Sequence, residues 1–142
     1  MEQCKKIQAI IYRKNSQDSL EILALRKIKQ KGGKWQPITG NVDSSESFEE
    51  ALKREIKEEI GIDELSKVID LDFQFEYNKD GKIFCEKAYA IELDSNEKIS
   101  LEQNPSLEHD DSIWISYDGA FEMFDFVQQK EALNILYKKF YS

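Results

Sequence analysis

Apolar residues are concentrated in four stretches that the pattern predicts to be β-strands, one of which alternates strictly between apolar and polar residues. Residues 68–77 alternate strictly, and residues 82–93 return from them after a turn at 78–81 whose glycine suits a positive φ. Residues 5–13 and 20–28 form the second pair of predicted strands, joined by a short polar segment. The pattern therefore predicts two β-hairpins.

The C-terminal part of the chain changes to a helical period. Apolar residues recur at steps of three and four over 117–124 and 128–140, which predicts two helices there. Shorter extended segments are expected at 35–38 and 113–115, and the polar stretch 94–111, which contains a proline, is predicted to be a loop. The chain thus reads as a mixed α/β protein.

A further helix is predicted over 45–60, with an apolar stripe on one face and a stop at Gly61. Asp43, Ser44 or Ser45 can supply the N-cap. The stripe consists of Phe48, Ala51, Leu52, Ile56 and Ile60. Most of the charged residues on this helix are expected to lie on an ordinary solvated face.

Two glutamates break this amphipathic pattern. At about 100° per residue, Glu55 and Glu59 fall inside the apolar arc, where a carboxylate is costly unless a cation or hydrogen-bond donors meet it. Glu58 lies at the edge of the arc, and Arg54 can pair with it from four residues away. Carboxylate oxygens are the hard ligands that Mg²⁺ and Mn²⁺ prefer, and Mg²⁺ commonly bridges substrate phosphates. A backbone carbonyl at Gly40 can also approach a metal closely.

Composition and charge limit the functions that the whole chain can have. The 142 residues are 40% hydrophobic and 34% charged, so we expect one soluble domain spanning 1–142. No apolar run is long enough for a membrane span, and the first residues lack the apolar region of a signal peptide, so a cytoplasmic location is expected. Cys4 and Cys85 are expected to be reduced thiols, with a disulfide as the alternative. The net charge of −8 argues against binding a long nucleic acid but not against a small nucleotide.

The helix and the turn before it resemble the Nudix hydrolase box, G-x5-E-x7-R-E-U-x-E-E-x-G-U, where U is aliphatic. Gly40, Glu46 and the run 54–62 (REIKEEIGI) match all nine of its constrained positions. The resemblance implies an α/β/α sandwich around a central mixed, curved β-sheet. It also implies Mg²⁺, with Mn²⁺ as an alternative, and a phosphorylated small-molecule substrate.

Other parts of the chain are similar to the dihydroneopterin triphosphate and dATP pyrophosphatase branch of that family. A Trp-Gln segment precedes Thr39 and Gly40, and a Glu-His pair precedes a Trp near the C-terminus. The resemblance implies that Glu108 joins the metal site and that Arg26 and Thr39 touch substrate. His109 is the only histidine, and we assign it no chemistry, although it could orient Glu108 or touch the substrate.

These observations predict metal-assisted hydrolysis of a nucleoside or pterin triphosphate to the monophosphate and pyrophosphate. The predicted metal ligands are Glu55, Glu58, Glu59, Glu108 and the carbonyl of Gly40. Either Glu55 or Glu108 is expected to be the base, while Arg54 and Glu46 orient the carboxylates. A hydrolase of dinucleoside polyphosphates or other X-linked diphosphates and a non-catalytic nucleotide sensor are the alternatives. The chain is expected to be a monomer or a homodimer.

Several basic and aromatic residues could contact the substrate or serve an ordinary structural role. Lys29 and Lys31 in the loop after the second strand read as solvated, and Trp35 reads as a core or rim residue. Five aromatic residues are sufficient either for a pocket wall or for the core, with the core favoured for those that point inward. These are Phe73, Phe75, Tyr77, Phe84 and Tyr89.

Overall fold

The computed structural model describes residues 3–104 and 107–141 and contains a seven-stranded sheet in that part of the chain. The strands are β1 (Gln3–Lys14), β2 (Leu20–Lys27), β3 (Trp35–Gln36), β4 (Ile38–Asn41), β5 (Lys67–Lys79), β6 (Lys82–Glu92) and β7 (His109–Ser116). The order is β3-β2-β1-β6-β5, with β4 paired to β1 and β7 paired to β2. Because β1 and β6 run parallel while the other pairs are antiparallel, the sheet is mixed.

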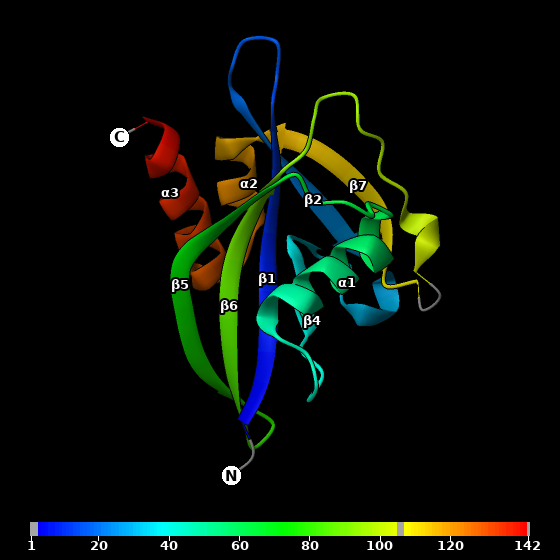
Figure 1. The fold of residues 1–142 in the computed structure, drawn as a ribbon, viewed down its shortest axis with the longest axis vertical. Coiled ribbons are helices and arrows are strands. Elements are labelled where there is room, and N and C mark those ends of the chain that lie inside the picture. Colours follow the sequence, from blue (N-terminus) through cyan, green and yellow to red (C-terminus); the bar gives the residue numbers. More distant parts are fainter. Residues whose placement is uncertain (1–2, 105–106, 142) are drawn as a thin grey trace.

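Helices cover both faces of this sheet, as Figure 1 shows. They are α1 (Phe48–Ile60), α2 (Tyr117–Met123) and α3 (Val127–Tyr141), together with the 3-10 turns η1 (Lys29–Lys31) and η2 (Leu101–Gln103). Side chains of β1 alternate between the faces. Ile7 and Ile11 pack in the core cluster under α1, and Ile10 and Tyr12 pack in the cluster under α2 and α3. The predicted α/β/α sandwich with a mixed sheet is confirmed, and the long strands β5 and β7 curve around it (Figure 1).

Helix α1 begins later than the pattern predicted. Its N-cap is Ser47, not Asp43, Ser44 or Ser45. The Ser47 side chain accepts a hydrogen bond from the backbone N–H of Glu50, whose carboxylate accepts one from the Ser47 N–H. This reciprocal capping box satisfies two backbone donors at once, and it places the helix start directly before the first residue of the apolar stripe.

The polar stretch 94–111 is also more ordered than a loop. It contains η2, and β7 begins within it at His109 because residues 109–116 pair with β2. Residues 105–106 of this stretch lie outside the described part. The strict alternation predicted for 68–77 is interrupted by a bulge between Asp70 and Phe73. The two predicted hairpins are confirmed.

The structure also bears on the expected absence of a membrane span and on the expected state of the cysteines. None of the described helices is long and apolar enough to cross a bilayer. Both cysteines are free thiols, with Cys85 buried and Cys4 partly buried.

Candidate functional site

Helix α1 carries its two anomalous glutamates toward the interior, as the periodicity predicted. Glu55 is 8% exposed and Glu59 is 3% exposed, although both are carboxylates. Glu58 lies at the rim of the same face, with its side chain 42% exposed. The three carboxylates therefore share one side of α1, and two of them are shielded from water.

The glycine before α1 makes room for one of these carboxylates. A Cβ atom added to Gly40 would lie 2.2 Å from Cδ of Glu55, so any side chain at this position of β4 would displace the Glu55 carboxylate. Burial raises the pKa of Glu55 to about 7, and the neighbouring charges of Glu58 and Glu59 add to this effect while Arg54 opposes it. Glu55 is thus a buried acid that titrates near neutral pH.

Arg54 holds the turn before α1 and the carboxylates of α1 together. Its guanidinium contacts both oxygens of Glu46, at 2.8 Å and 2.9 Å, and donates to the carbonyl of Asn41 at 2.8 Å. It also contacts Glu55 at 2.9 Å and Glu58 at 3.5 Å. The fork on Glu46 lowers the pKa of that carboxyl to about 2. The predicted pairing of Arg54 with Glu58 is confirmed.

His109 contacts the second buried glutamate, which sequence reasoning did not foresee. Its Nδ1 lies 2.6 Å from Oε2 of Glu59, and its Nε2 lies 3.3 Å from the side-chain nitrogen of Gln36. Donation from Nδ1 to the Glu59 carboxylate, which can only accept when ionised, leaves Nε2 positioned to accept from the Gln36 amide. Asn104 donates to the other oxygen of Glu59 at 2.8 Å. His109 therefore orients Glu59, not Glu108.

Two predicted site residues, Glu108 and Arg26, make contacts outside α1. The carbonyl of Glu108 accepts from the backbone N–H of Ile28, and its carboxylate lies 3.6 Å from the ammonium of Lys31. Arg26 donates to Asp110 at 2.8 Å, an ion pair that raises the pKa of Arg26. The roles of Glu108 in metal binding and of Arg26 in substrate binding stay predictions.

The donor set on α1 suits a hard divalent cation, but the carboxylates are engaged with other partners. Among the described residues, no three His, Cys, Asp or Glu side chains lie close enough together to ligate one ion. Glu55 faces Arg54, while Glu59 faces His109 and Asn104. Carboxylate oxygens on a largely buried helix face suit the predicted metal. To ligate one ion together, Glu55 and Glu59 would rotate about their side-chain bonds.

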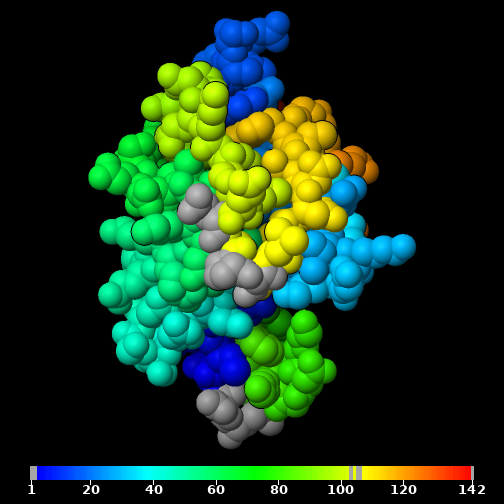
Figure 2. All heavy atoms as spheres, turned by 90° about the vertical axis from the view of Figure 1, so that its right-hand side faces the viewer, coloured from blue at the N-terminus to red at the C-terminus, as the bar shows by residue number. Residues whose placement is uncertain are grey.

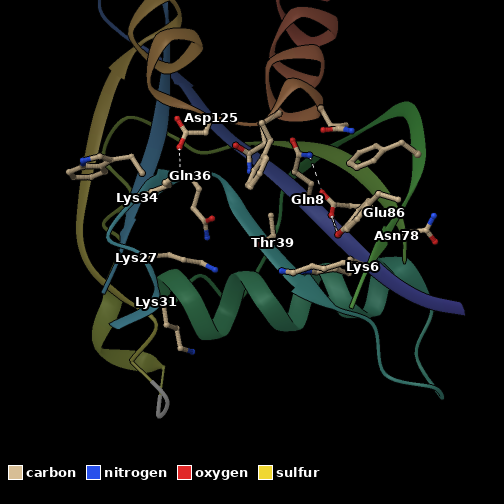
Figure 3. A pocket seen from close by; sticks show the side chains of 17 residues that line it. Lys6, Gln8, Lys27, Lys31, Lys34, Gln36, Thr39, Asn78, Glu86 and Asp125 are labelled. Atoms are coloured by element: carbon tan, nitrogen blue, oxygen red, sulfur yellow. Dashed lines mark hydrogen bonds and ion pairs between the residues drawn. The ribbon is translucent and has the colours of Figure 1, made fainter. Parts of the chain in front are cut away.

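A pocket of about 470 Å³ opens on the other side of β4, a volume typical of small-molecule sites. Its lining is basic and aromatic, and Figure 3 shows Lys27, Lys31 and Lys34 on one side of it. Lys31 is exposed, as expected, and also lines this pocket. The lining also includes Lys6, Gln8, Trp35, Gln36, Thr39, Phe75, Tyr77, Glu86, Phe126 and Gln129. Phe75 and Tyr77 thus form part of a pocket wall, whereas Phe73 and Tyr89 pack with the core.

The segments that surround the carboxylates come from distant parts of the sequence. Figure 2 shows α1, the turn η2 and the start of β7 side by side, with η1 next to them. No local motif predicts this assembly, because His109 reaches Glu59 and Gln36 only after β7 pairs with β2, and Asn104 reaches Glu59 from a segment 45 positions away. Gln8 is a polar residue inside the otherwise apolar strand 5–13. This break in the apolar pattern could have indicated the pocket from the sequence alone.

Comparison with known proteins places these features in context. A protein-family model described as the NUDIX domain matches residues 5–135. The chain is 31% identical over 100 residues to the RNA pyrophosphohydrolase of Campylobacter jejuni, covering 64% of this chain and 64% of that protein. It is 26% identical over 116 residues to an octanoyltransferase of Myxococcus xanthus, covering 79% of this chain and 31% of that protein. The chain therefore spans less than two thirds of the length of either relative.

Solved structures share the fold. The crystal structure of a binary complex of a C. elegans Ap4A hydrolase has a TM-score of 0.79 at 24% identity, covering 96% of both chains. The E. coli dihydroneopterin triphosphate pyrophosphohydrolase has a TM-score of 0.76 at 22% identity, covering 92% of both chains. At these identities the likeness shows the fold alone.

Proposed function

This chain belongs to the Nudix family, and on that premise we propose that it hydrolyses a nucleoside or pterin triphosphate with Mg²⁺ or Mn²⁺. The products are the monophosphate and pyrophosphate. A small triphosphate suits the pocket volume, and the net charge of −8 disfavours a long nucleic acid as substrate.

The position of strand β4 is the observation that carries this proposal. Thr39 lines the pocket, while the next residue, Gly40, packs against Glu55. Gln36 also lines the pocket and reaches Glu59 through His109. A ligand in the pocket is therefore separated from the carboxylates of α1 by strand β4, and in this proposal its phosphate chain extends toward them.

The residues of the site have separate roles in this proposal. Lys27, Lys31 and Lys34 supply positive charge for the phosphates. A divalent cation would neutralise phosphate charge in the transition state. Its proposed ligands are Glu55, Glu58, Glu59, Glu108 and the Gly40 carbonyl.

The proton of the attacking water requires a base. Glu55 and Glu108 are the candidates. Arg54 orients Glu55 and Glu58 through the contacts described above, and Thr39 and Arg26 are the proposed substrate contacts from the strands beside the pocket.

The test is a product analysis over a substrate panel with Mg²⁺. It includes ribonucleoside and deoxyribonucleoside triphosphates, dihydroneopterin triphosphate, diadenosine tetraphosphate and a 5′-triphosphorylated RNA oligomer, with products separated by ion-exchange chromatography. We expect pyrophosphate and a monophosphate from a small triphosphate. Glu59→Gln should lower kcat about a hundredfold or more, because it removes a proposed ligand.

Glu64→Gln is the matched control, because Glu64 is an exposed carboxylate just beyond α1. It should leave kcat unchanged. Release of neither phosphate nor pyrophosphate from any substrate would refute the proposal and favour a nucleotide sensor. A clear preference for diadenosine tetraphosphate, with ATP and AMP as products, would favour the dinucleoside alternative.

A further inference from the structure

The sheet face under α2 and α3 changes from apolar to polar where it enters the pocket. Along β1 this face carries Ile10 in the core and then Gln8, and along β6 it carries Ala88 in the core and then Glu86. Gln8 is fully buried and Glu86 is 6% exposed. Buried polar side chains are costly where an atom has no hydrogen-bond partner, so the partners of these two residues decide whether the boundary suits a ligand.

These two residues form a connected floor with a third from β5. The Gln8 side-chain nitrogen donates to Glu86 Oε2 at 3.2 Å, as the dashed line in Figure 3 shows. The Tyr77 hydroxyl donates to Glu86 Oε1 at 3.0 Å. Each carboxylate oxygen thus accepts one hydrogen bond from the protein and has capacity for a second. Lys6 also lines the pocket and attracts Glu86 electrostatically.

Gln8 contributes an acceptor that the protein itself leaves unused. Its Oε1 is buried and has no hydrogen-bond partner among the described residues. The carboxylate of Glu86 fixes the amide orientation, because a flipped amide would place Oε1 against a negatively charged oxygen. Unpaired buried acceptors are rare in folded proteins, and one in a pocket lining indicates that a ligand supplies the missing donor.

The acceptors of the floor that have capacity for a ligand are Gln8 Oε1 and the two oxygens of Glu86. Their complement is a ring edge on which a ring N–H stands beside an exocyclic amino group. Guanine has such an edge, and the same 2-amino-4-oxo edge occurs in pterins. Adenine and cytosine instead place a ring nitrogen lone pair beside their amino group, and that lone pair would face the carboxylate.

The walls of the pocket suit a flat bicyclic ring. The rings of Phe75 and Tyr77 stand side by side on β5, with centroids 6.0 Å apart and planes 27° from parallel. Phe126, which is 61% exposed, lines the pocket from the segment before α3. Aromatic faces bind bases by stacking without distinguishing among them, so discrimination falls to the polar floor.

We propose that Gln8 and Glu86 select substrates with a 2-amino-4-oxo ring edge, so that the chain acts on a guanine nucleotide or a pterin triphosphate. This inference rests on the proposed function for its catalytic consequence. Its binding consequence is independent of hydrolysis. A site with buried acceptors rejects ligands that lack the matching donors, because those acceptors then stay unpaired.

The first test uses the wild-type chain and no metal. Isothermal titration calorimetry with GMP, IMP and AMP compares three nucleotides that differ only on the edge in question, since IMP lacks the 2-amino group. We expect GMP to bind about tenfold more tightly than IMP and IMP more tightly than AMP. Equal affinities for GMP and AMP would overturn the proposal whether or not any substrate is hydrolysed.

The second test uses Glu86→Gln, which replaces an acceptor by a donor at nearly constant volume. With Mg²⁺, kcat/KM for GTP or for dihydroneopterin triphosphate should fall about tenfold to a hundredfold, while kcat/KM for ATP changes little. The substrate with the higher wild-type kcat/KM shows whether the recognised ring is a guanine or a pterin. Glu76→Gln is the matched control, because Glu76 is an exposed carboxylate on β5 outside the pocket.

The outcomes separate this inference from the proposed function. If no triphosphate is hydrolysed but GMP still binds selectively, the hydrolase proposal fails and the reading of the floor stands. If triphosphates are hydrolysed and Glu86→Gln lowers kcat/KM for GTP and ATP equally, the hydrolase proposal stands and this inference fails. Should Glu86→Gln not fold, as judged by circular dichroism, the wild-type nucleotide series alone decides.

Discussion

Gly40 and Glu55 occupy complementary positions, because the carboxylate of Glu55 fills the space that a Cβ on residue 40 would need, 2.2 Å from Cδ. The contact couples strand β4 to one of the two buried carboxylates of α1. Gly40→Ala should therefore displace Glu55 and lower kcat about a hundredfold, because displacements of about 1 Å in a catalytic site have effects of that size. Steady-state hydrolysis at saturating Mg²⁺ measures it.

The same substitution should also cost about 1–3 kcal/mol in the free energy of unfolding, as overpacking typically does. Gly119→Ala is the control, because Gly119 lies in α2 and the nearest atom to an added Cβ there is the Ser116 hydroxyl at 3.3 Å. That variant should retain full activity. If the kcat of Gly40→Ala is within about twofold of wild type, the placement of Glu55 against Gly40 is not required for activity.

His109 should matter to stability through its contact with Glu59. His109→Ala removes the partner at 2.6 Å from a carboxylate that is only 3% exposed and opens a cavity beside it. We expect a loss of about 2–4 kcal/mol in the free energy of unfolding, measured by urea denaturation in EDTA. His109→Gln keeps a donor near Glu59 and should recover about half of that loss. Equal losses in both variants would mean that packing, not the hydrogen bond, explains the effect.

Features set by local periodicity were predictable from the sequence. The burial of Glu55 and Glu59 follows from their place in the apolar arc of α1, and no tertiary information was needed. The N-cap was missed although Ser47 and Glu50 have capping-box spacing, because several residues before Ser47 can also cap a helix. Tertiary packing decides between them, since Phe48, the residue after Ser47, packs against the core.

Features set by strand order were not predictable. His109 and Glu59 meet across 50 positions of sequence, and their contact depends on the register of β7 on β2, which shifts next to Lys27. Gln8 and Glu86 are separated by 78 positions and are neighbours because β1 pairs in parallel with β6. A parallel pair has no connecting turn to indicate it in the sequence.

Glu55 should make the stability of the metal-free chain depend on pH. Burial raises its pKa from an ordinary value of 4.5 to about 7, so the folded chain binds this proton more tightly than the unfolded chain. The stabilisation is therefore complete below about pH 4.5 and is lost as the pH rises to about 7. In EDTA, the free energy of unfolding should fall by up to about 3 kcal/mol more in wild type than in Glu55→Gln between about pH 5 and pH 8. Parallel pH profiles for the two proteins would contradict this assignment.

Arg54 should resist replacement even by lysine. Its planar guanidinium contacts both oxygens of Glu46 and the Asn41 carbonyl while also reaching Glu55, and a single ammonium cannot make these contacts together. Arg54→Lys should therefore lower kcat about tenfold to a hundredfold, the usual effect of losing a group that orients ligands. The free energy of unfolding should fall by about 1–2 kcal/mol.

Arg13→Lys provides the comparison for this variant. Arg13 also pairs with a carboxylate, that of Glu21 at 2.8 Å, and it lies over the ring of Trp114. It belongs to β1 but lies away from Ile7, the residue of β1 that pairs with Gly40. It should lose a similar amount of stability and no activity. The two variants together separate the general cost of replacing a paired arginine from the specific loss of carboxylate orientation on α1. If Arg13→Lys and Arg54→Lys reduce kcat equally, Arg54 has no orienting role.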